Sequence, residues 1–339
     1  MLKPLLPAAL LLATPLWAEA PRTVTDIGPV QGLVASVMGD LGSPELLVPQ
    51  GASPHSHALT PSQARALQQA ELVFWIGPDL TPGIGRKIEA IAGEATVLEL
   101  SEQPGVMHLA ARDNAIFGTR AEADTGHEHD DHDHDEDTHD DHGHDDHADD
   151  DHDDHAHDTA HAHDHDHGDD DPHLWLSPDN AAAWLPVIAD ALAEADPENA
   201  ETYRANAAAA RTALEEAVSE ARDMLGAVQE DRFVVFHDAY QYYEQAFGLH
   251  VIGAIKLADA SDPSPARLDA LRDVISDSGA SCVFAEPQFD PRLIAAVTEG
   301  TEIGVADLDP LGMALEPGAG FYPALIGDLA SRIAACAER

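Results

Sequence analysis

Short apolar runs alternate with amphipathic stretches along the first hundred residues of the chain. The runs are rich in branched and aromatic side chains, which is typical of buried strands, and they occupy residues 23–27, 46–49, 72–76 and 96–100. The stretches between them have the spacing of helices, at residues 32–38, 60–70 and 84–92. Strands that alternate with helices predict a mainly parallel sheet with helices on its faces.

The same alternation returns after residue 230. Strands are expected at residues 233–236, 250–255, 282–285 and 304–307. Helices are expected at residues 239–247, 265–278, 291–299 and 322–337. The chain therefore has the α/β class and divides into two lobes, each with a central, mainly parallel sheet flanked by helices.

A run rich in Ala, Glu and Arg separates the two lobes. Asp196 is a good N-cap, Pro197 suits a first helical turn, and Gly226 suits the end of a helix. Roughly 29 residues at about 1.5 Å each predict a rigid helix of roughly 43 Å that joins the lobes. The predicted boundaries are residues 19–195 for the N-terminal lobe, 196–226 for the linking helix and 227–339 for the C-terminal lobe.

One segment lacks hydrophobic periodicity and carries much of the charge. The formal net charge of the 339 residues is −46, and residues 122–171 contain 24 acidic residues and 15 of the 21 histidines but no Lys or Arg. This composition cannot bury enough apolar surface to offset ordering, so we expect a disordered insert within the N-terminal lobe. The acidity excludes nucleic acid as a partner, because phosphate binding requires clustered Lys and Arg. It favours cations.

The first residues have the pattern of a secretory signal. Lys3 supplies a positive start, and an apolar stretch of about 13 residues follows it. A membrane-spanning helix needs about 20 residues, so we expect cleavage rather than an anchor. The cut falls after Ala18 or after Ala20, and Ala18 is favoured because Pro21 would directly follow the second cut. Residues 1–18 are therefore a predicted signal peptide, and the mature protein is expected in the periplasm.

Export changes the interpretation of the two cysteines. Cys282 opens a predicted strand, and Cys336 lies in the last predicted helix. Thiols pair in an oxidising compartment. We expect a disulfide that fastens the last helix to the sheet, with two buried unpaired thiols as the alternative.

Six histidines lie outside the insert: His55, His57, His108, His173, His237 and His250. Three of them occupy loops or strand ends. His55 follows a predicted strand, His173 directly precedes a helix, and His237 ends a strand. Ligands of open parallel sheets gather where loops leave the carboxyl ends of the strands, so each could reach one cleft. His57 is interpreted as a loop residue, and His108 and His250 as structural.

The segments around these histidines resemble those of a known family, both in their order along the chain and in their residues. Its members are the zinc-binding receptors of bacterial ABC importers, the ZnuA-type branch of the metal receptors, which also carry an acidic His-rich insert at this place. The matching motifs are His55 with Leu59-Thr60-Pro61-Ser62, Asp171-Pro172-His173-Leu174-Trp175-Leu176, Val235-Phe236-His237-Asp238-Ala239-Tyr240, Phe284-Ala285-Glu286-Pro287-Gln288-Phe289 and Leu308-Asp309-Pro310-Leu311-Gly312.

The resemblance implies a metal site in the cleft between the lobes. His55, His173 and His237 fall on the three imidazole ligands of the family. Asp309 falls on a carboxylate that some members use as fourth ligand, while others have water there. Asp307 lies close enough in sequence to be an alternative.

Two further positions bear on the site. Pro54 stands where some zinc receptors have a glutamate that approaches the metal, which favours Asp309 or water as fourth ligand. Glu286 is a candidate acceptor for the N–H of a ligand, with a capping or salt-bridge role as the alternative. The insert histidines are candidate weak, exchangeable ligands: His127, His129, His132, His134, His139, His142, His144, His147, His152, His155, His157, His161, His163, His165 and His167.

The ligand chemistry favours zinc. Three neutral imidazoles and one oxygen at about 2.0–2.2 Å form a tetrahedral zinc site. Manganese prefers more carboxylates and a higher coordination number, and the related manganese receptors have a carboxylate where His237 stands. Copper, cobalt and cadmium are expected to compete in the test tube.

The sequence thus predicts an exported, monomeric zinc receptor that performs no reaction. It would deliver Zn(II) to a permease in the inner membrane that a cytoplasmic ATPase powers, and it could receive zinc from periplasmic donor proteins. The insert would capture or sense zinc, or would be a solvated acidic segment without consequence. The alternatives for the whole protein are an exported zinc buffer and a zinc hydrolase with Glu286 as base, although no His-Glu-x-x-His motif occurs.

Overall fold

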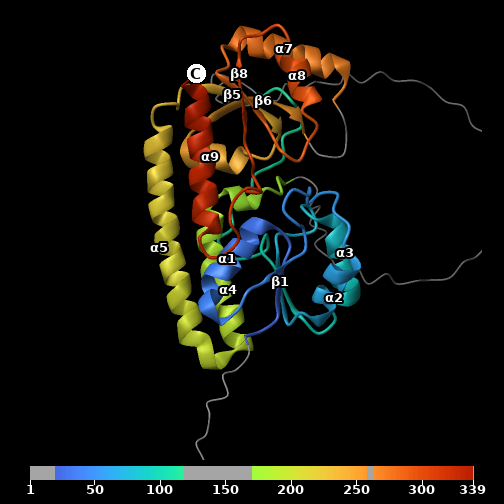
Figure 1. Ribbon diagram of the computed structural model, residues 1–339, viewed down its shortest axis with the longest axis vertical. Coiled ribbons are helices and arrows are strands. Elements are labelled where there is room, and N and C mark those ends of the chain that lie inside the picture. The colour runs from blue at the N-terminus through green and yellow to red at the C-terminus, as the bar shows by residue number, and fades with distance from the viewer. Residues whose placement is uncertain (1–19, 118–169, 258–262, 339) are drawn as a thin grey trace, which may run out of the picture. The chain divides into compact units, whose positions relative to one another are not determined.

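The computed structural model describes residues 20–117, 170–257 and 263–338 (Figure 1). The predicted signal peptide and the insert histidines lie outside these ranges. Two four-stranded sheets, each flanked by helices, confirm the predicted α/β class with two lobes. Among the residues described, no helix is both long and apolar enough to cross a membrane.

The N-terminal sheet has the strand order β2-β1-β3-β4, and all its strands are parallel. Its strands are β1 (Thr23–Thr25), β2 (Glu45–Leu46), β3 (Leu72–Trp75) and β4 (Thr96–Glu99). The helices that follow them are α1 (Gly28–Met38), α2 (Pro61–Gln69) and α3 (Pro82–Ile91). Helix α2 begins where the sequence predicts, because the Thr60 side chain and Gln63 cap each other's backbone N–H groups.

A buried carboxylate fixes the turn between β1 and α1. Asp26 accepts the backbone N–H of Ile27 on one oxygen and that of Ile76 on the other, each at 2.7 Å. The turn after β1 is thereby joined to the end of β3. Burial raises the pKa of Asp26 to about 7, although both N–H groups favour the ionised form.

The C-terminal sheet repeats the arrangement with the order β6-β5-β7-β8, again all parallel. Its strands are β5 (Arg232–His237), β6 (His250–Lys256), β7 (Cys282–Ala285) and β8 (Gly304–Asp307). Its helices are α6 (Gln241–Phe247), α7 (Pro265–Ser278), α8 (Arg292–Thr298) and α9 (Phe321–Ala337). In both sheets the first strand of the lobe is central, so the loops after β1 and β5 open at the middle of a sheet edge.

Helix α5 (Ala200–Leu225) lies beside elements of both lobes (Figure 1). Helix α4 (Pro178–Ala195) and helix α5 pack on each other, and α5 also packs on α1, α6 and α9. The predicted long linking helix is confirmed, but it begins at Ala200 rather than at Pro197. Residues Pro197–Asn199 form a separate 3-10 turn, because the Asp196 carboxylate accepts the Asn199 amide and the Tyr203 hydroxyl and holds the chain there.

Helix α9 is a second bridge between the lobes. Its first residue, Phe321, lies against Gly32 of α1 so closely that a Cβ at Gly32 would come within 2.8 Å of the Phe321 Cβ. Its other end carries Cys336, which forms the predicted disulfide with Cys282 of β7. One continuous buried core runs from the N-terminal sheet through these helices to one face of the C-terminal sheet.

Candidate metal centre

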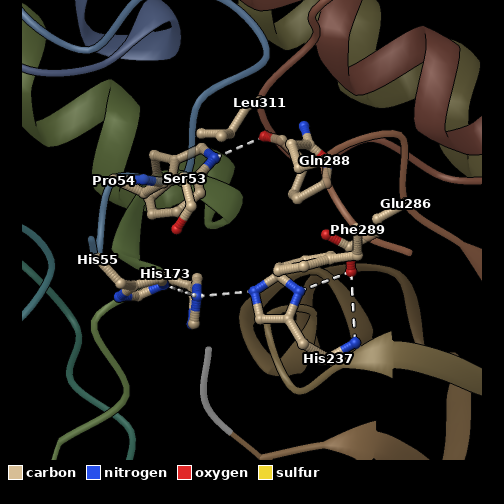
Figure 2. Close-up of a pocket in the computed structure, with 11 residues that line it drawn as sticks. Ser53, Pro54, His55, His173, His237, Glu286, Gln288, Phe289 and Leu311 are labelled. Atoms are coloured by element: carbon tan, nitrogen blue, oxygen red, sulfur yellow. Dashed lines mark hydrogen bonds and ion pairs between the residues drawn. The ribbon is translucent and has the colours of Figure 1, made fainter. Parts of the chain in front are cut away.

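Three histidines from different parts of the chain converge beside the two sheets (Figure 2). His55 lies in the loop between β2 and α2 and is half-buried. His173 is buried and directly precedes the 3-10 turn Leu174–Leu176. His237 is buried and is the last residue of β5. The structure therefore brings together the three histidines that the sequence predicts as ligands.

Two of the spacings between their nitrogens match a small tetrahedral ion. Nε2 of His173 lies 3.3 Å from Nε2 of His55 and 3.2 Å from Nε2 of His237. Two nitrogens bound at about 2.0–2.1 Å to a tetrahedral zinc are about 3.3–3.4 Å apart. Among the described residues, no carboxylate joins this group of potential ligand atoms, which lie within 4.8 Å of one another.

A buried carboxylate orients His173. Asp171 Oδ1 lies 2.7 Å from His173 Nδ1 and also accepts the backbone N–H of His173 at 3.0 Å. The ionised carboxylate only accepts, so with Asp171 ionised Nδ1 carries the proton and Nε2 keeps its lone pair for a metal. Burial raises the pKa of Asp171 to about 7, while the His173 N–H and the charge of Arg112 oppose this rise. No role for Asp171 is predicted from the sequence, although it lies two residues before a candidate ligand.

A second carboxylate orients His237 in the same way. Glu286 Oε1 lies 2.6 Å from His237 Nδ1, and both side chains are buried. Figure 2 shows this pair on the side of His237 away from His173. Of the two roles predicted for Glu286, its position suits the acceptor for a ligand N–H. The nearby Tyr240 hydroxyl donates to the Leu308 carbonyl, and its pKa is raised by burial and by the charges of Glu286 and Asp309.

The walls of the site are mainly apolar. Phe289 lies edge-on to the His237 ring, with centroids 5.5 Å apart, and stacks on Phe236. Trp175 is held by a hydrogen bond from its indole N–H to the Pro310 carbonyl at 2.8 Å. The cavity between them has a volume of about 10 Å³, which is about the space that one water requires.

Asp309 is not brought to the three histidines. Its Oδ1 accepts the Gln288 amide at 2.8 Å and the Leu311 N–H at 3.0 Å, and its Oδ2 accepts the Met313 N–H. The carboxylate thereby holds the loop after β8. Asp307 is an exposed residue at the end of β8 and is also outside the group. Neither aspartate is placed as a fourth ligand, and a fourth ligand stays a prediction.

The remaining described histidines have other partners. His57 lies 3.3 Å from the Gln63 amide oxygen, and Nδ1 of His108 lies 3.2 Å from Oδ2 of Asp170. His250 opens β6. These positions agree with the roles predicted for them outside the metal site.

The sequence model of the family "Zinc-uptake complex component A periplasmic" matches residues 23–336. The chain belongs to this family. It is 49% identical over 325 residues to the high-affinity zinc uptake system protein ZnuA of Paracoccus denitrificans (strain Pd 1222), covering 96% of this chain and 94% of that protein. It is 39% identical over 321 residues to the protein of that name from Brucella suis biovar 1 (strain 1330), covering 95% and 93%.

Solved structures share the fold of this zinc-uptake family member. A crystal structure of ZnuA superposes with a TM-score of 0.68 at 24% identity, covering 92% of this chain and 98% of that one. The periplasmic zinc-binding protein TroA from Treponema pallidum superposes with a TM-score of 0.68 at 17% identity, covering 94% and 100%. The two-lobed architecture is therefore common to distant metal receptors.

Proposed function

We propose that this protein is a zinc receptor that binds Zn(II) through Nε2 of His55, His173 and His237. The observation that carries the proposal is the convergence of three imidazole nitrogens at 3.2 and 3.3 Å. That separation is close to the edge of a tetrahedron around zinc, about 3.3–3.4 Å. The two carboxylate partners of the Nδ1 atoms leave the Nε2 lone pairs available without protein rearrangement.

Water is the fourth ligand in this proposal. Both oxygens of Asp309 are already bound by an amide and two backbone N–H groups, so its ligation would cost these hydrogen bonds. A set of three imidazoles and one water suits zinc, whereas manganese prefers more carboxylates and a higher coordination number.

The zinc ion is the cargo of this site rather than the cofactor of a reaction. A cavity of about 10 Å³ is sized for an ion or a water. Glu286 lines the same small cavity, but its carboxylate is engaged with Nδ1 of His237. These features favour a receptor over the zinc hydrolase.

Delivery to an ABC-type importer follows from the family. Relatives at 49% and 39% identity are named as proteins of high-affinity zinc uptake systems, and the family is described as periplasmic. We infer that this protein works in the periplasm and hands zinc to a permease in the inner membrane. For the insert we propose zinc capture or sensing, because fifteen imidazoles among many carboxylates offer numerous candidate metal ligands.

A competition titration with a tight zinc chelator tests the cleft site, because weak sites do not compete. We expect the full chain to bind one zinc tightly, and His237→Ala to lose it. His250→Ala is the matched control and should bind like wild type. A tight site that survives His237→Ala, or that disappears when residues 127–167 are deleted, would show that the cleft is not the receptor site.

A further inference from the structure

Residues 109–117, named here the strap, contact residues that adjoin two of the proposed ligands, His173 and His237. The strap follows the N-terminal sheet in the chain but binds the C-terminal lobe (Figure 1). Phe117 donates its N–H to the Ile252 carbonyl at 3.0 Å, and Ala254 donates to the Ala115 carbonyl at 2.9 Å. The strap therefore extends the C-terminal sheet at the edge strand β6.

Arg112 is the basic residue of the strap. Its guanidinium donates to Asp238 Oδ1 at 2.9 Å and to Glu244 Oε1 at 3.0 Å. The side chains of Asp238 and Glu244 are 6% and 10% exposed, and that of Arg112 is 23% exposed. The guanidinium also lies 4.0 Å above the Phe117 ring. A planar fork shared by two buried carboxylates and covered by an aromatic ring has a defined orientation.

This ion-pair cluster is next to His237. Asp238 follows His237 directly and donates its N–H to the Lys256 carbonyl. Glu244 lies in α6 and also accepts the Val251 N–H at 3.3 Å. Arg112 therefore joins the residue after a proposed ligand to both α6 and β6.

The same strap holds the residue that orients His173. Asp171 donates its N–H to the Leu109 carbonyl at 2.8 Å. The Tyr242 hydroxyl of α6 donates to the Asp171 carbonyl and accepts the Leu109 N–H, each at 3.0 Å. A displacement of the strap would thus move Asp171 as well as Asp238, and with them both imidazoles.

We propose that Arg112 is a positioning residue, which holds His173 and His237 at the spacing that zinc requires before zinc binds. The inference rests on the proposed function, since it concerns the affinity of that site. It predicts that loss of the guanidinium weakens zinc binding, because the ligands must then be ordered when zinc binds.

Electrostatics alone predicts the opposite sign. Arg112 carries a positive charge and neutralises two carboxylates near a site for a divalent cation. Its removal relieves repulsion and exposes negative charge, and both changes would tighten zinc binding. The direction of the change in affinity therefore separates positioning from simple charge.

The test compares the full-length Arg112→Gln protein with wild type and with Arg332→Gln. Arg332 pairs with Asp328 within α9 and provides a matched loss of one guanidinium–carboxylate pair. Chelator competition should show zinc affinity lower by about tenfold or more in Arg112→Gln, in the range typical of residues behind metal ligands. Arg332→Gln should bind like wild type. Arg112→Lys should be intermediate, because an ammonium cannot reproduce the two-carboxylate fork.

A spectroscopic measurement keeps the inference testable apart from affinity. In the zinc-free protein, NMR should show Nδ1–H signals for His173 and His237 bound to carboxylates, and these should weaken or shift in Arg112→Gln but not in Arg332→Gln. If Arg112→Gln does not fold, the triple variant with Arg112→Met, Asp238→Asn and Glu244→Gln removes the cluster without leaving a buried charge, and it should show the same loss.

Unchanged or tighter zinc binding in the folded variant would overturn the inference. Failure of the wild-type protein to bind zinc would instead overturn the proposed function. The NMR comparison would then still decide whether Arg112 orients the two imidazoles.

Discussion

Replacing Asp171 by Asn removes one buried charge and keeps an acceptor beside His173. The wild-type Oδ1 accepts both the Nδ1–H and the backbone N–H of His173, at 2.7 and 3.0 Å. An Asn side chain can offer its carbonyl oxygen to the same two donors. The variant therefore tests the charge of the carboxylate with little change in its shape.

The expected loss follows from the strength of one hydrogen bond. A bond to a charged partner contributes about 1.5–3 kcal/mol and a neutral one about 0.5–1.5 kcal/mol. The difference, about 1–1.5 kcal/mol, corresponds to a zinc affinity lower by roughly tenfold at neutral pH. This is the lower end of the 10–100-fold range of about 1.4–2.7 kcal/mol known for residues behind metal ligands.

The stability of the zinc-free protein should not fall with the zinc affinity in Asp171→Asn. Burial raises the pKa of Asp171 to about 7, so above that pH the zinc-free fold holds the carboxylate ionised and is destabilised by the full cost of burying its charge. Asp171→Asn should therefore leave the zinc-free protein at least as stable as wild type at pH 8, as measured by chemical denaturation. A variant that binds zinc less well without being less stable indicates a role in tuning the ligand.

The control for this experiment is the neighbouring residue. Asp170 has a side chain that is 51% exposed and pairs with His108 rather than with a proposed ligand. Asp170→Asn should bind zinc like wild type in the same chelator competition. Equal affinities for Asp171→Asn and wild type would refute the reasoning that the carboxylate raises the basicity of His173.

Three further predictions concern other parts of the molecule. Asp309→Asn should lower zinc affinity by less than about tenfold in the chelator titration. Loss of a direct ligand should exceed the roughly 10–100-fold effect of a residue behind the ligands. A loss of that size in Asp309→Asn would restore Asp309 as a ligand. Burial raises the pKa of Asp26 to about 7, so the unfolding free energy of the zinc-free protein should fall as pH rises from about 4 to about 7, and denaturation of Asp26→Asn should lack this part of the slope. Replacing Cys282 and Cys336 by Ala opens a bridge between residues 54 apart and should cost about 4 kcal/mol of stability, with a lower melting temperature but unchanged zinc affinity at 25 °C.

Most strands of both sheets could be predicted because they are short apolar runs between turn residues. The run at residues 282–285, for example, is strand β7 with the predicted bounds. Strand β2 differs from its prediction, because only Leu46 of the apolar run at residues 46–49 joins the sheet, together with Glu45. The start of the linking helix was less predictable. Asp196 and Pro197 signal a boundary, but the 3-10 turn that they open depends on the Tyr203 hydroxyl, one turn into α5. Local signals gave the place of the boundary and not its geometry.

In the candidate site, the histidines could be predicted from the sequence but their supporting contacts could not. His55, His173 and His237 could be proposed from motifs, because each lies where a loop leaves a strand or precedes a helix. The carboxylate partner of His237 is Glu286, 49 residues away in the sequence. The sequence left two roles open for Glu286, an acceptor for a ligand N–H and a capping or salt-bridge residue. Arg112 is 126 residues from Asp238, in a segment without periodicity. Only the packing of the strap on β6 brings these two residues together.

The arrangement of carboxylates also bears on how a receptor releases its cargo. Asp171 and Glu286 lie behind His173 and His237 and bind their Nδ1 atoms, rather than occupying a place among the proposed metal ligands. Their charge then acts on zinc only through the orientation and basicity of the imidazoles. A small displacement of the strap or of the loop after β8 would weaken the site without removing a ligand. A site of this kind can hold zinc tightly in the free receptor and release it after a modest change in lobe geometry, because hydrogen-bond strength falls steeply with misalignment.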